Sequence, residues 1–444
     1  MTFTHFVNVL EKLSNYILII PGTLTLIAGI SLTIKTRFVQ IRKIPTMLKI
    51  LFSSVFYRHK KDSNSHTIQA SKALFTAMAT TIGISSIVAP VIAIRLGGPG
   101  ALAGFLMATL LGGAVTFTEV TLALTYRKKL KDGTIMGGPM QYLKAINPFL
   151  ATSYAYGGIA LMVIWSARQA NTLSDLLFPY HVPHYLTGLI LAIIVTLTLL
   201  GGIKRISNAT EKIVPTMFFL YIGAAIWIVL CNAEKLPGIF SLIFGSIFSK
   251  EAIMGAAVGS GMLYVVRWGL FGAFQNNEAG MGTAAIPHSM ADTKDPEQQG
   301  ILSMVSIFSH GIICFLSGLV ILLSGTWENL SIGLGINVIS TSFGMYFSTI
   351  GPIILAISAM LFAYSTILGN SYNGSQCFSF LTTNRKLNIY YAITAILIFI
   401  GAISDVKFIW VITDFFIIPV ALPNIIGILI LSFKRKKLFK DINP

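Results

Sequence analysis

The segment that most constrains this 444-residue chain is FGAFQNNEAGMG at residues 271–282, a polar, glycine-rich stretch inside an apolar run of membrane-spanning length. A lipid bilayer offers the backbone no water, so a regular spanning helix should not carry the polar run QNNE at 275–278. Backbone that leaves the helix at this depth persists only where protein buries it or where it lines a cavity. A second interruption, GISSIVAP at 83–90, breaks an earlier apolar span. Two broken spans in corresponding places of two halves indicate the binding site of a secondary transporter.

The composition, with 54% hydrophobic and 11% charged residues, is that of a membrane protein. Eleven apolar segments are long enough to span a bilayer. They cover residues 14–34, 71–96, 101–125, 149–177, 185–201, 213–232, 252–287, 301–324, 346–368, 388–404 and 408–432. The three cysteines lie far apart, which predicts neither a disulfide framework nor a metal cluster. The sequence therefore predicts an all-α, multi-pass membrane protein.

The basic residues are divided unequally between the two sides that these spans define. Of the 32 Lys and Arg residues, 25 fall in loops on one side and five on the other, while Arg168 and Arg267 lie within spans. Basic residues accumulate on the cytoplasmic side, so we expect the N-terminus outside and the C-terminus inside. The net charge of +16 is thereby explained by topology, and no nucleic-acid partner is expected.

The eleven segments divide into one extra span followed by two sets of five. The broken segments open the two sets and cross the membrane in opposite directions, as an inverted repeat requires. Apolar residues at spacings of three and four over 41–55, with basic residues between them, predict an amphipathic helix on the cytoplasmic leaflet. The expected organisation is an extra N-terminal helix (1–35), a cytoplasmic connector (36–70), two repeats (71–232 and 252–432) and a basic cytoplasmic tail (433–444).

The first break has chemistry that suits a zwitterion together with a cation. Pro90 lacks an N–H and its ring clashes with the carbonyl of Ser86, so it disfavours a continuous helix and we expect 83–86 to be unwound. The turn before the break ends with free carbonyls at about 79–82, which suit a cation. The half-helix after it begins with free N–H groups, which suit a carboxylate. The alternative for this span alone is a simple proline kink.

Several short motifs together give the chain a resemblance to a known family. They are LGGPGA at 96–101, GGPMQYL at 137–143, Gln169 with Asn171, GGIKRI at 201–206, EKIVP at 211–215, NEAGMG at 277–282, and LFAYSTILG at 361–369 followed by Cys377. With these motifs in order from about residue 70 to PNI at 423–425, the chain resembles the alanine/glycine:cation symporters. The resemblance implies a LeuT-type 5+5 inverted repeat with one extra N-terminal helix. It also implies sodium-coupled symport of a small neutral amino acid, similar to alanine or glycine, by alternating access in the cell inner membrane.

Two departures from the family pattern fall in the part of the fold that touches substrate and ion. The family's first break usually reads GTGN, where this chain has GISS at 83–86. The family usually has an Arg-Gly pair before the second break, where this chain has Gly272 and Ala273. These departures leave three alternatives to sodium symport open: a proton-coupled carrier, an uncoupled carrier or exchanger, and a substrate-sensing relative that does not transport.

The resemblance implies a sodium site between the end of the first half-helix and the eighth core span. The matching oxygens are the carbonyls of Ala79, Ile82 and Phe362 and the hydroxyls of Ser365 and Thr366. Positions 362, 365 and 366 share one helix face, and a hard cation prefers oxygen ligands. The alternative is that both hydroxyls bond to their own helix.

The substrate is expected to lie beside the same break. Its carboxylate should meet N–H groups near Gly83, Ile84 and Ser85, flanked by Thr81 and Ser86, and its amine should meet Gln169, Asn171, Phe274, Asn276 or Asn277 on the opposing elements. The alternative for the amide side chains is that they only link neighbouring helices.

The carboxylates within spans are expected to be structural, whereas a buried arginine such as Arg168 is expected to be functional. Glu278 either relays protons or caps backbone N–H groups of the second break, and the glycine-rich setting favours the structural role. Glu119 and Asp414 are expected to be interhelical partners, whereas no partner of Arg168 or Arg267 can be named. No motif for a nucleophile, a phosphate or a metal is present, so we expect no enzyme and no cofactor beyond the coupling ion. The expected partners are the amino acid, sodium and the lipid bilayer, without an obligate protein partner.

Overall fold

The computed structural model describes residues 3–56, 67–129, 135–247, 265–382, 386–434 and 439 of the 444-residue chain. The described part is almost entirely helical. Its α-helices are α1 (Phe3–Ile17), α2 (Ile19–Lys35), α3 (Val39–Arg42), α4 (Ile44–Phe56), α5 (Ala70–Thr81), α6 (Ile84–Gly97), α7 (Ala101–Thr125), α8 (Pro139–Lys144), α9 (Pro148–Leu177), α10 (His184–Leu199), α11 (Gly202–Cys231), α12 (Leu236–Ile247), α15 (Gly272–Asn277), α16 (Ala285–His288), α17 (Pro296–Ser324), α18 (Ile336–Phe347), α19 (Ile350–Thr382), α20 (Leu387–Ile403) and α21 (Val406–Lys434). A π-helical segment, η3 (Val265–Phe271), precedes α15, and three short 3₁₀ turns are η1 (Phe178–Tyr180), η2 (Ala233–Lys235) and η4 (Thr326–Glu328). The two strands β1 (Lys128–Lys129) and β2 (Ile135–Met136) form one antiparallel pair.

Eight helical segments in the described residues are long and apolar enough to cross a membrane. They are His5–Lys35, Ala70–Gly97, Ala101–Thr125, Pro148–Tyr180, Gly202–Cys231, Pro296–Ser324, Ile350–Thr382 and Phe408–Lys434. Each coincides with one of the eleven predicted spans. The predicted spans 185–201 and 388–404 correspond to the shorter apolar helices α10 and α20, and the predicted span 252–287 begins outside the described residues. The count of eleven crossings and the orientation of the chain stay predictions.

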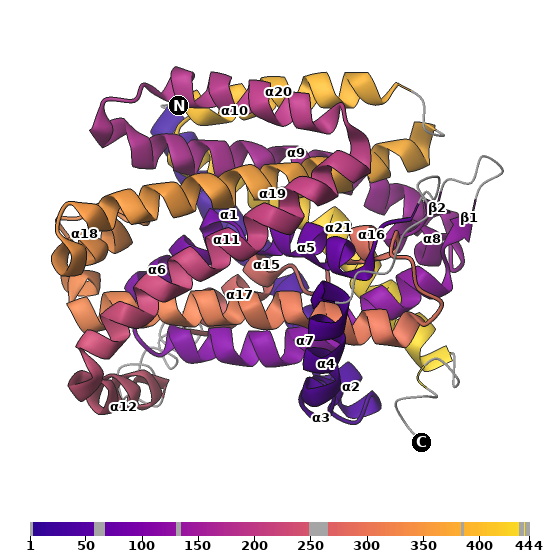
Figure 1. Ribbon diagram of the computed structural model, residues 1–444, viewed down its shortest axis with the longest axis horizontal. Helices are drawn as coiled ribbons and strands as arrows, with labels where there is room; N and C mark the ends of the chain where they lie inside the picture. The colour runs from indigo at the N-terminus through magenta and orange to yellow at the C-terminus, as the bar shows by residue number, and fades with distance from the viewer. Residues whose placement is uncertain are drawn as a thin grey trace.

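Most of the long helices run roughly side by side, and α11 crosses them obliquely (Figure 1). Helix α9 packs against α19, α20 and α21, while α17 packs against α7. The β-hairpin, α8 and α16 gather at one end of the long helices, whereas α12 and α18 lie at the other (Figure 1). Helices α10 and α20 pair at the edge and expose large apolar side chains such as Ile193 and Ile396, each more than half exposed, as expected of a lipid-facing surface.

Helix starts follow the local sequence. Asn147 accepts a hydrogen bond from the N–H of Phe149 at 2.9 Å and caps α9, whose first residue is a proline. Asp295 likewise caps α17 by accepting from the N–H groups of Glu297 and Gln298. These caps fix where α9 and α17 begin, and therefore which of their side chains reach the breaks.

The first break is narrower than expected from sequence. Helix α5 ends at Thr81 and α6 begins at Ile84, so only Ile82 and Gly83 are unwound, with Gly83 in an extended conformation. The expectation that 83–86 is unwound was therefore wrong for Ile84, Ser85 and Ser86, which are helical. Pro90 lies in the interior of α6, seven residues past the unwound glycine. It frees the carbonyl of Ser86 inside a helix that otherwise continues.

The second break is also shifted relative to the prediction. Gln275, Asn276 and Asn277 belong to the short helix α15, and the backbone leaves the helix only at Glu278, whose φ of 60° is left-handed. The chain stays non-helical until α16 begins at Ala285, and two glycines in this stretch, Gly280 and Gly282, also have positive φ.

The predicted amphipathic helix over 41–55 is present as α3 and α4. Its apolar residues Ile41, Ile44, Leu48 and Val55 are all exposed, which suits contact with lipid.

Candidate functional site

The two unwound residues of the first break lie between two other helices. Gln169 on α9 accepts, through Oε1, a hydrogen bond from the N–H of Ile84 at 3.1 Å. Thr366 on α19 donates its hydroxyl to the carbonyl oxygen of Ile82 at 3.2 Å. A Cβ added to Gly83 would lie 2.9 Å from Oγ1 of Thr366 and 3.0 Å from Nε2 of Gln169. The three helices therefore meet at the break so closely that position 83 has no room for a side chain.

The structure brings the predicted sodium ligands of α5 and α19 together. Besides the Thr366–Ile82 contact, a Cβ on Gly369 would lie 3.4 Å from the carbonyl carbon of Ala79, so the two backbones are nearly touching. Ser365 differs from its neighbour, because its hydroxyl bonds to the carbonyl of Phe362 in its own helix at 3.1 Å and lies 3.2 Å from Sδ of Met217. The Thr366 hydroxyl and the carbonyls of Ala79 and Ile82 thus lie at the contact between α19 and the end of α5, and the binding of sodium by the five predicted groups stays a prediction.

The start of α6 offers the expected N–H groups, and one of them already has a partner. The first N–H groups of a helix lack partners inside the helix, and Gln169 takes that of Ile84. Ser86 donates its hydroxyl to the carbonyl of Thr81 at 3.4 Å, which links the two half-helices across the break. The Thr81 hydroxyl bonds instead to Ala77 in its own helix. Of these predicted substrate groups, the N–H groups of Gly83 and Ser85 are the ones left to meet a carboxylate.

Asn276 is the only predicted residue of α15 whose side chain contacts the first break. Its Nδ2 lies 3.3 Å from the carbonyl oxygen of Ser85 and 3.0 Å from Nε2 of His310 on α17. Cys314, one turn further along α17, donates its thiol to the carbonyl of Ser86 at 3.2 Å. The carbonyl freed by Pro90 is therefore paired with the Cys314 thiol. Sequence analysis missed both His310 and Cys314, and a histidine inside an apolar span was the signal that could have found the first.

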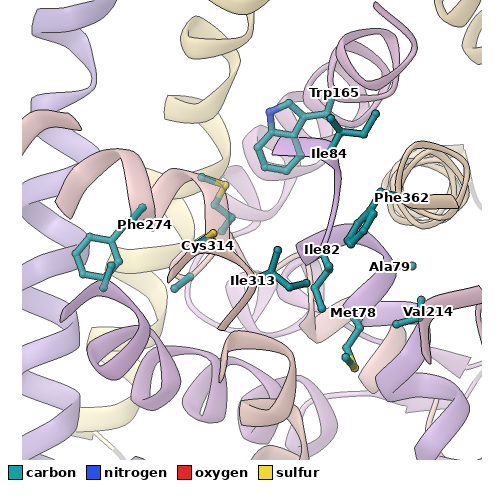
Figure 2. Close-up of a cluster of buried hydrophobic side chains, with 14 of the residues drawn as sticks. Met78, Ala79, Ile82, Ile84, Trp165, Val214, Phe274, Ile313, Cys314 and Phe362 are labelled. Carbon is teal, nitrogen blue, oxygen red and sulfur yellow. The ribbon is translucent and has the colours of Figure 1, made fainter. Parts of the chain in front are cut away.

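Three other predicted substrate residues do not face the first break. Asn171 donates through Nδ2 to the carbonyls of Gly401 and Ser404, each at 2.9 Å, and so holds the end of α20. Phe274 lines a small cavity with residues of α2 and α21, and in the view of Figure 2 it stands apart from Ile82 and Ile84. Asn277 donates to the carbonyl of Ala108 on α7 and caps Ala279. Residues two apart on a helix do not share a face, so Asn171 cannot accompany Gln169 nor Phe274 accompany Asn276.

The second break is held together by a buried network centred on Glu119. The Oε1 atom of this α7 carboxylate accepts from the N–H of Gly282 at 3.0 Å and from Nδ2 of Asn424 at 2.6 Å. Asn424 on α21 also donates to the carbonyl of Gly280 at 2.8 Å and accepts from the hydroxyl of Tyr142. Glu119 is thus the interhelical partner that the sequence predicted.

Glu278 also has a structural environment, although a different one from that expected. Its carboxylate accepts from the hydroxyl of Thr283 and lies beside that of Thr80 on α5. Glu278 was expected to cap backbone N–H groups of the break. Instead, Glu119 accepts from the N–H of Gly282, and the Asn277 side chain accepts from the N–H of Ala279. Glu278 therefore links the second break to the first half-helix rather than capping its own loop.

A charged cavity of about 160 Å³ adjoins Asn276. Its lining includes Arg168, Arg267, Asp414 and the two tryptophans Trp268 and Trp410. The guanidinium of Arg168 lies 4.4 Å from the ring centre of Trp410, and Arg267 lies 4.7 Å from that of Trp268. Gln275 donates to Asp414 at 2.7 Å. Arg168 thus points away from Gln169, its neighbour on α9. The cavity is also lined by Asn276, the residue whose side chain contacts the first break.

A break at Gly83 in one apolar span, together with a second break at Glu278, is the arrangement expected at the binding site of a secondary transporter. The chain matches the sodium:alanine symporter family over residues 1–443, and it belongs to that family. It is 34% identical to the sodium/alanine symporter AgcS of Methanococcus maripaludis, over all of this chain and 98% of that one. It is 30% identical to the probable sodium/glutamine symporter GlnT of Bacillus subtilis, over 91% and 84% of the two chains.

The fold is that of the LeuT-type transporters. The structure of MhsT in complex with L-phenylalanine superposes with a TM-score of 0.60 at 16% identity, over 81% of this chain and 87% of that one. This likeness concerns the fold. Together with the family it makes this chain a multi-pass protein of the cell membrane in a family of sodium-coupled amino-acid transporters.

Proposed function

We propose that the protein couples the inward movement of sodium to the uptake of a small neutral amino acid by alternating access. The observation that carries the proposal is the contact between the Thr366 hydroxyl and the Ile82 carbonyl beside Gly83. Oxygens from a helix end and from a second span, with no carboxylate among them, form a donor set for a hard monovalent cation.

The space beside the break favours a small substrate. Gln169 and Thr366 close off position 83, and the cavity that Asn276 lines has a volume of about 160 Å³. The N–H groups at the start of α6 attract a carboxylate, because they carry the positive end of the helix dipole. The Asn276 amide stands on the opposite side of the break and supplies a polar group for the amine. An amino acid similar to alanine or glycine satisfies both ends.

The coupling site and the substrate site share the unwound residues. The carbonyl of Ile82 belongs to the ion site, and the N–H groups that follow Gly83 belong to the substrate site. Occupation of one therefore organises the backbone of the other, which is a direct route to coupled binding.

Uptake by purified protein in proteoliposomes tests this proposal. Radiolabelled L-alanine and glycine should accumulate when an inward sodium gradient is imposed, and not with an equal potassium gradient. A proton gradient that drives the same accumulation without sodium would favour the proton-coupled alternative. Saturable L-alanine binding without uptake under any gradient would favour a substrate-sensing role.

A further inference from the structure

The side chain of His310 is buried beside the first break, and the polar atom nearest to its Nε2 is the amide nitrogen of Asn276. His310 is 1% exposed, and its Nε2 lies 3.0 Å from Nδ2 of Asn276. Ring–thiol distances to Cys314 are longer, at 3.4 and 3.8 Å. A buried histidine beside an unwound membrane helix is costly to retain without a role.

The contacts fix which way the Asn276 amide points. A carbonyl oxygen only accepts hydrogen bonds, so the amide atom that faces the carbonyl of Ser85 must be the nitrogen. The same nitrogen lies 3.0 Å from Nε2 of His310, whereas Sγ of Cys314 is farther away at 3.8 Å, so its two hydrogens point to Ser85 and His310. It follows that Nε2 of His310 accepts, that the ring is neutral and that its hydrogen is on Nδ1.

This orientation leaves the Asn276 oxygen available to a ligand. Within the described residues Oδ1 of Asn276 has no hydrogen-bond partner, and the residue lines the polar cavity. A carbonyl-type oxygen turned toward the cavity accepts a hydrogen bond, whereas a flipped amide would present donors to the same place. Only the first arrangement attracts an ammonium group.

We infer that His310 is a positioning residue for the amine of the substrate. Its Nε2 holds the Asn276 amide in the one orientation that offers oxygen to an α-ammonium group. His310 does not touch the substrate, and it acts through Asn276. The inference rests on the proposed transport of an amino acid and adds the residue that sets its recognition at the amine end.

The decisive experiment compares L-alanine with L-lactate, which keeps the carboxylate and replaces the ammonium by a hydroxyl. Binding of each to the purified full-length protein is measured by isothermal titration. His310→Phe removes the acceptor, and we expect L-alanine to bind about tenfold more weakly while L-lactate binding is unchanged. The preference for L-alanine over L-lactate should therefore shrink by the same factor. His310→Gln, which can place an acceptor oxygen near the former Nε2, should restore it.

His288 provides a matched control. It is also fully buried, and its Nδ1 lies 2.7 Å from the amide nitrogen of Gln299, away from the first break. His288→Phe should leave the L-alanine to L-lactate preference at the wild-type value. If His310→Phe does not give folded protein, His310→Asn, with an acceptor too short to reach Asn276, should reduce the preference in its place.

A double-mutant comparison separates positioning from general damage. In the His310→Phe background, adding Asn276→Ala should cause no further loss of preference, because the two residues act as a unit. An unchanged preference in both His310→Phe and His310→Asn would overturn the inference. Wild-type protein that does not bind L-alanine at all would instead contradict the proposed function.

Discussion

The two breaks are built in opposite ways. At the first, the N–H of Ile84 and the carbonyl of Ile82, on either side of Gly83, bond to side chains of α9 and α19 through single hydrogen bonds of 3.1 and 3.2 Å to neutral groups. At the second, the stretch from Glu278 to Ala284 is held by one carboxylate, two amides and one hydroxyl from four other elements, supplied by Glu119, Asn277, Asn424 and Tyr154. Neutral single contacts are easily exchanged for an ion or a substrate, whereas a charged buried network is not. The first break is thus suited to binding and the second to holding the scaffold in shape.

The largest effect expected from this difference is on stability. Glu119→Ala removes the acceptor of Gly282 and Asn424 and leaves both donors buried without it. We expect the free energy of unfolding to fall by about 2–5 kcal/mol, seen as a lower melting temperature of the purified protein. Glu119→Gln keeps one acceptor oxygen and should lose less. A wild-type melting temperature for Glu119→Ala would show that this network does not hold the second break.

Gly83→Ala should strongly impair binding while leaving the fold intact. The new methyl group would meet Thr366 and Gln169 at 2.9 and 3.0 Å, so either the break or the two side chains must move. We expect binding of L-alanine in sodium to weaken by about 100-fold, the equivalent of about 2.7 kcal/mol. Gly223→Ala on α11 is the control, because a Cβ there meets nothing within 4 Å. Equal L-alanine affinities of the two variants would contradict the close packing at position 83.

The two adjacent hydroxyls of α19 should differ in their effect on sodium. Thr366 reaches the carbonyl of Ile82, whereas Ser365 bonds within its own helix and to Met217. We expect Thr366→Ala to raise the sodium concentration for half-maximal uptake about tenfold, and Ser365→Ala to raise it about threefold. Thr366→Ser keeps the hydroxyl and should retain sodium affinity. If Ser365→Ala has the larger effect, the ion lies nearer Phe362 than Ile82.

The sequence predicted the positions of the helices better than the directions of the side chains. Gln169 and Thr366 were found because family motifs mark them, and they do meet at the break. Asn171 was taken with Gln169 as one motif, and Phe274 was placed at the site with the second break, although a helix turns about 100° per residue and places them on other faces than Gln169 and Asn276. His310 carries no motif, and its role depends on a contact between α15 and α17 that only the folded chain reveals.

The smallest effect is expected at Pro90, where sequence analysis expected a larger one. Because α6 is helical from Ile84 onward, Pro90 does not hold the break open, and Gly83 is unwound by its contacts with other helices. The remaining role of Pro90 is to free the Ser86 carbonyl, which accepts the Cys314 thiol at 3.2 Å. Pro90→Ala restores a helical N–H to that carbonyl, which then has two donors. We therefore expect the L-alanine affinity of Pro90→Ala to differ from that of the wild type by less than about threefold. Adding Cys314→Ala, which removes the competing thiol, should have no additional effect in the Pro90→Ala background. A loss of L-alanine binding in Pro90→Ala, reversed by Ser85→Gly, would instead show that the proline keeps the break unwound in a state other than the one seen here.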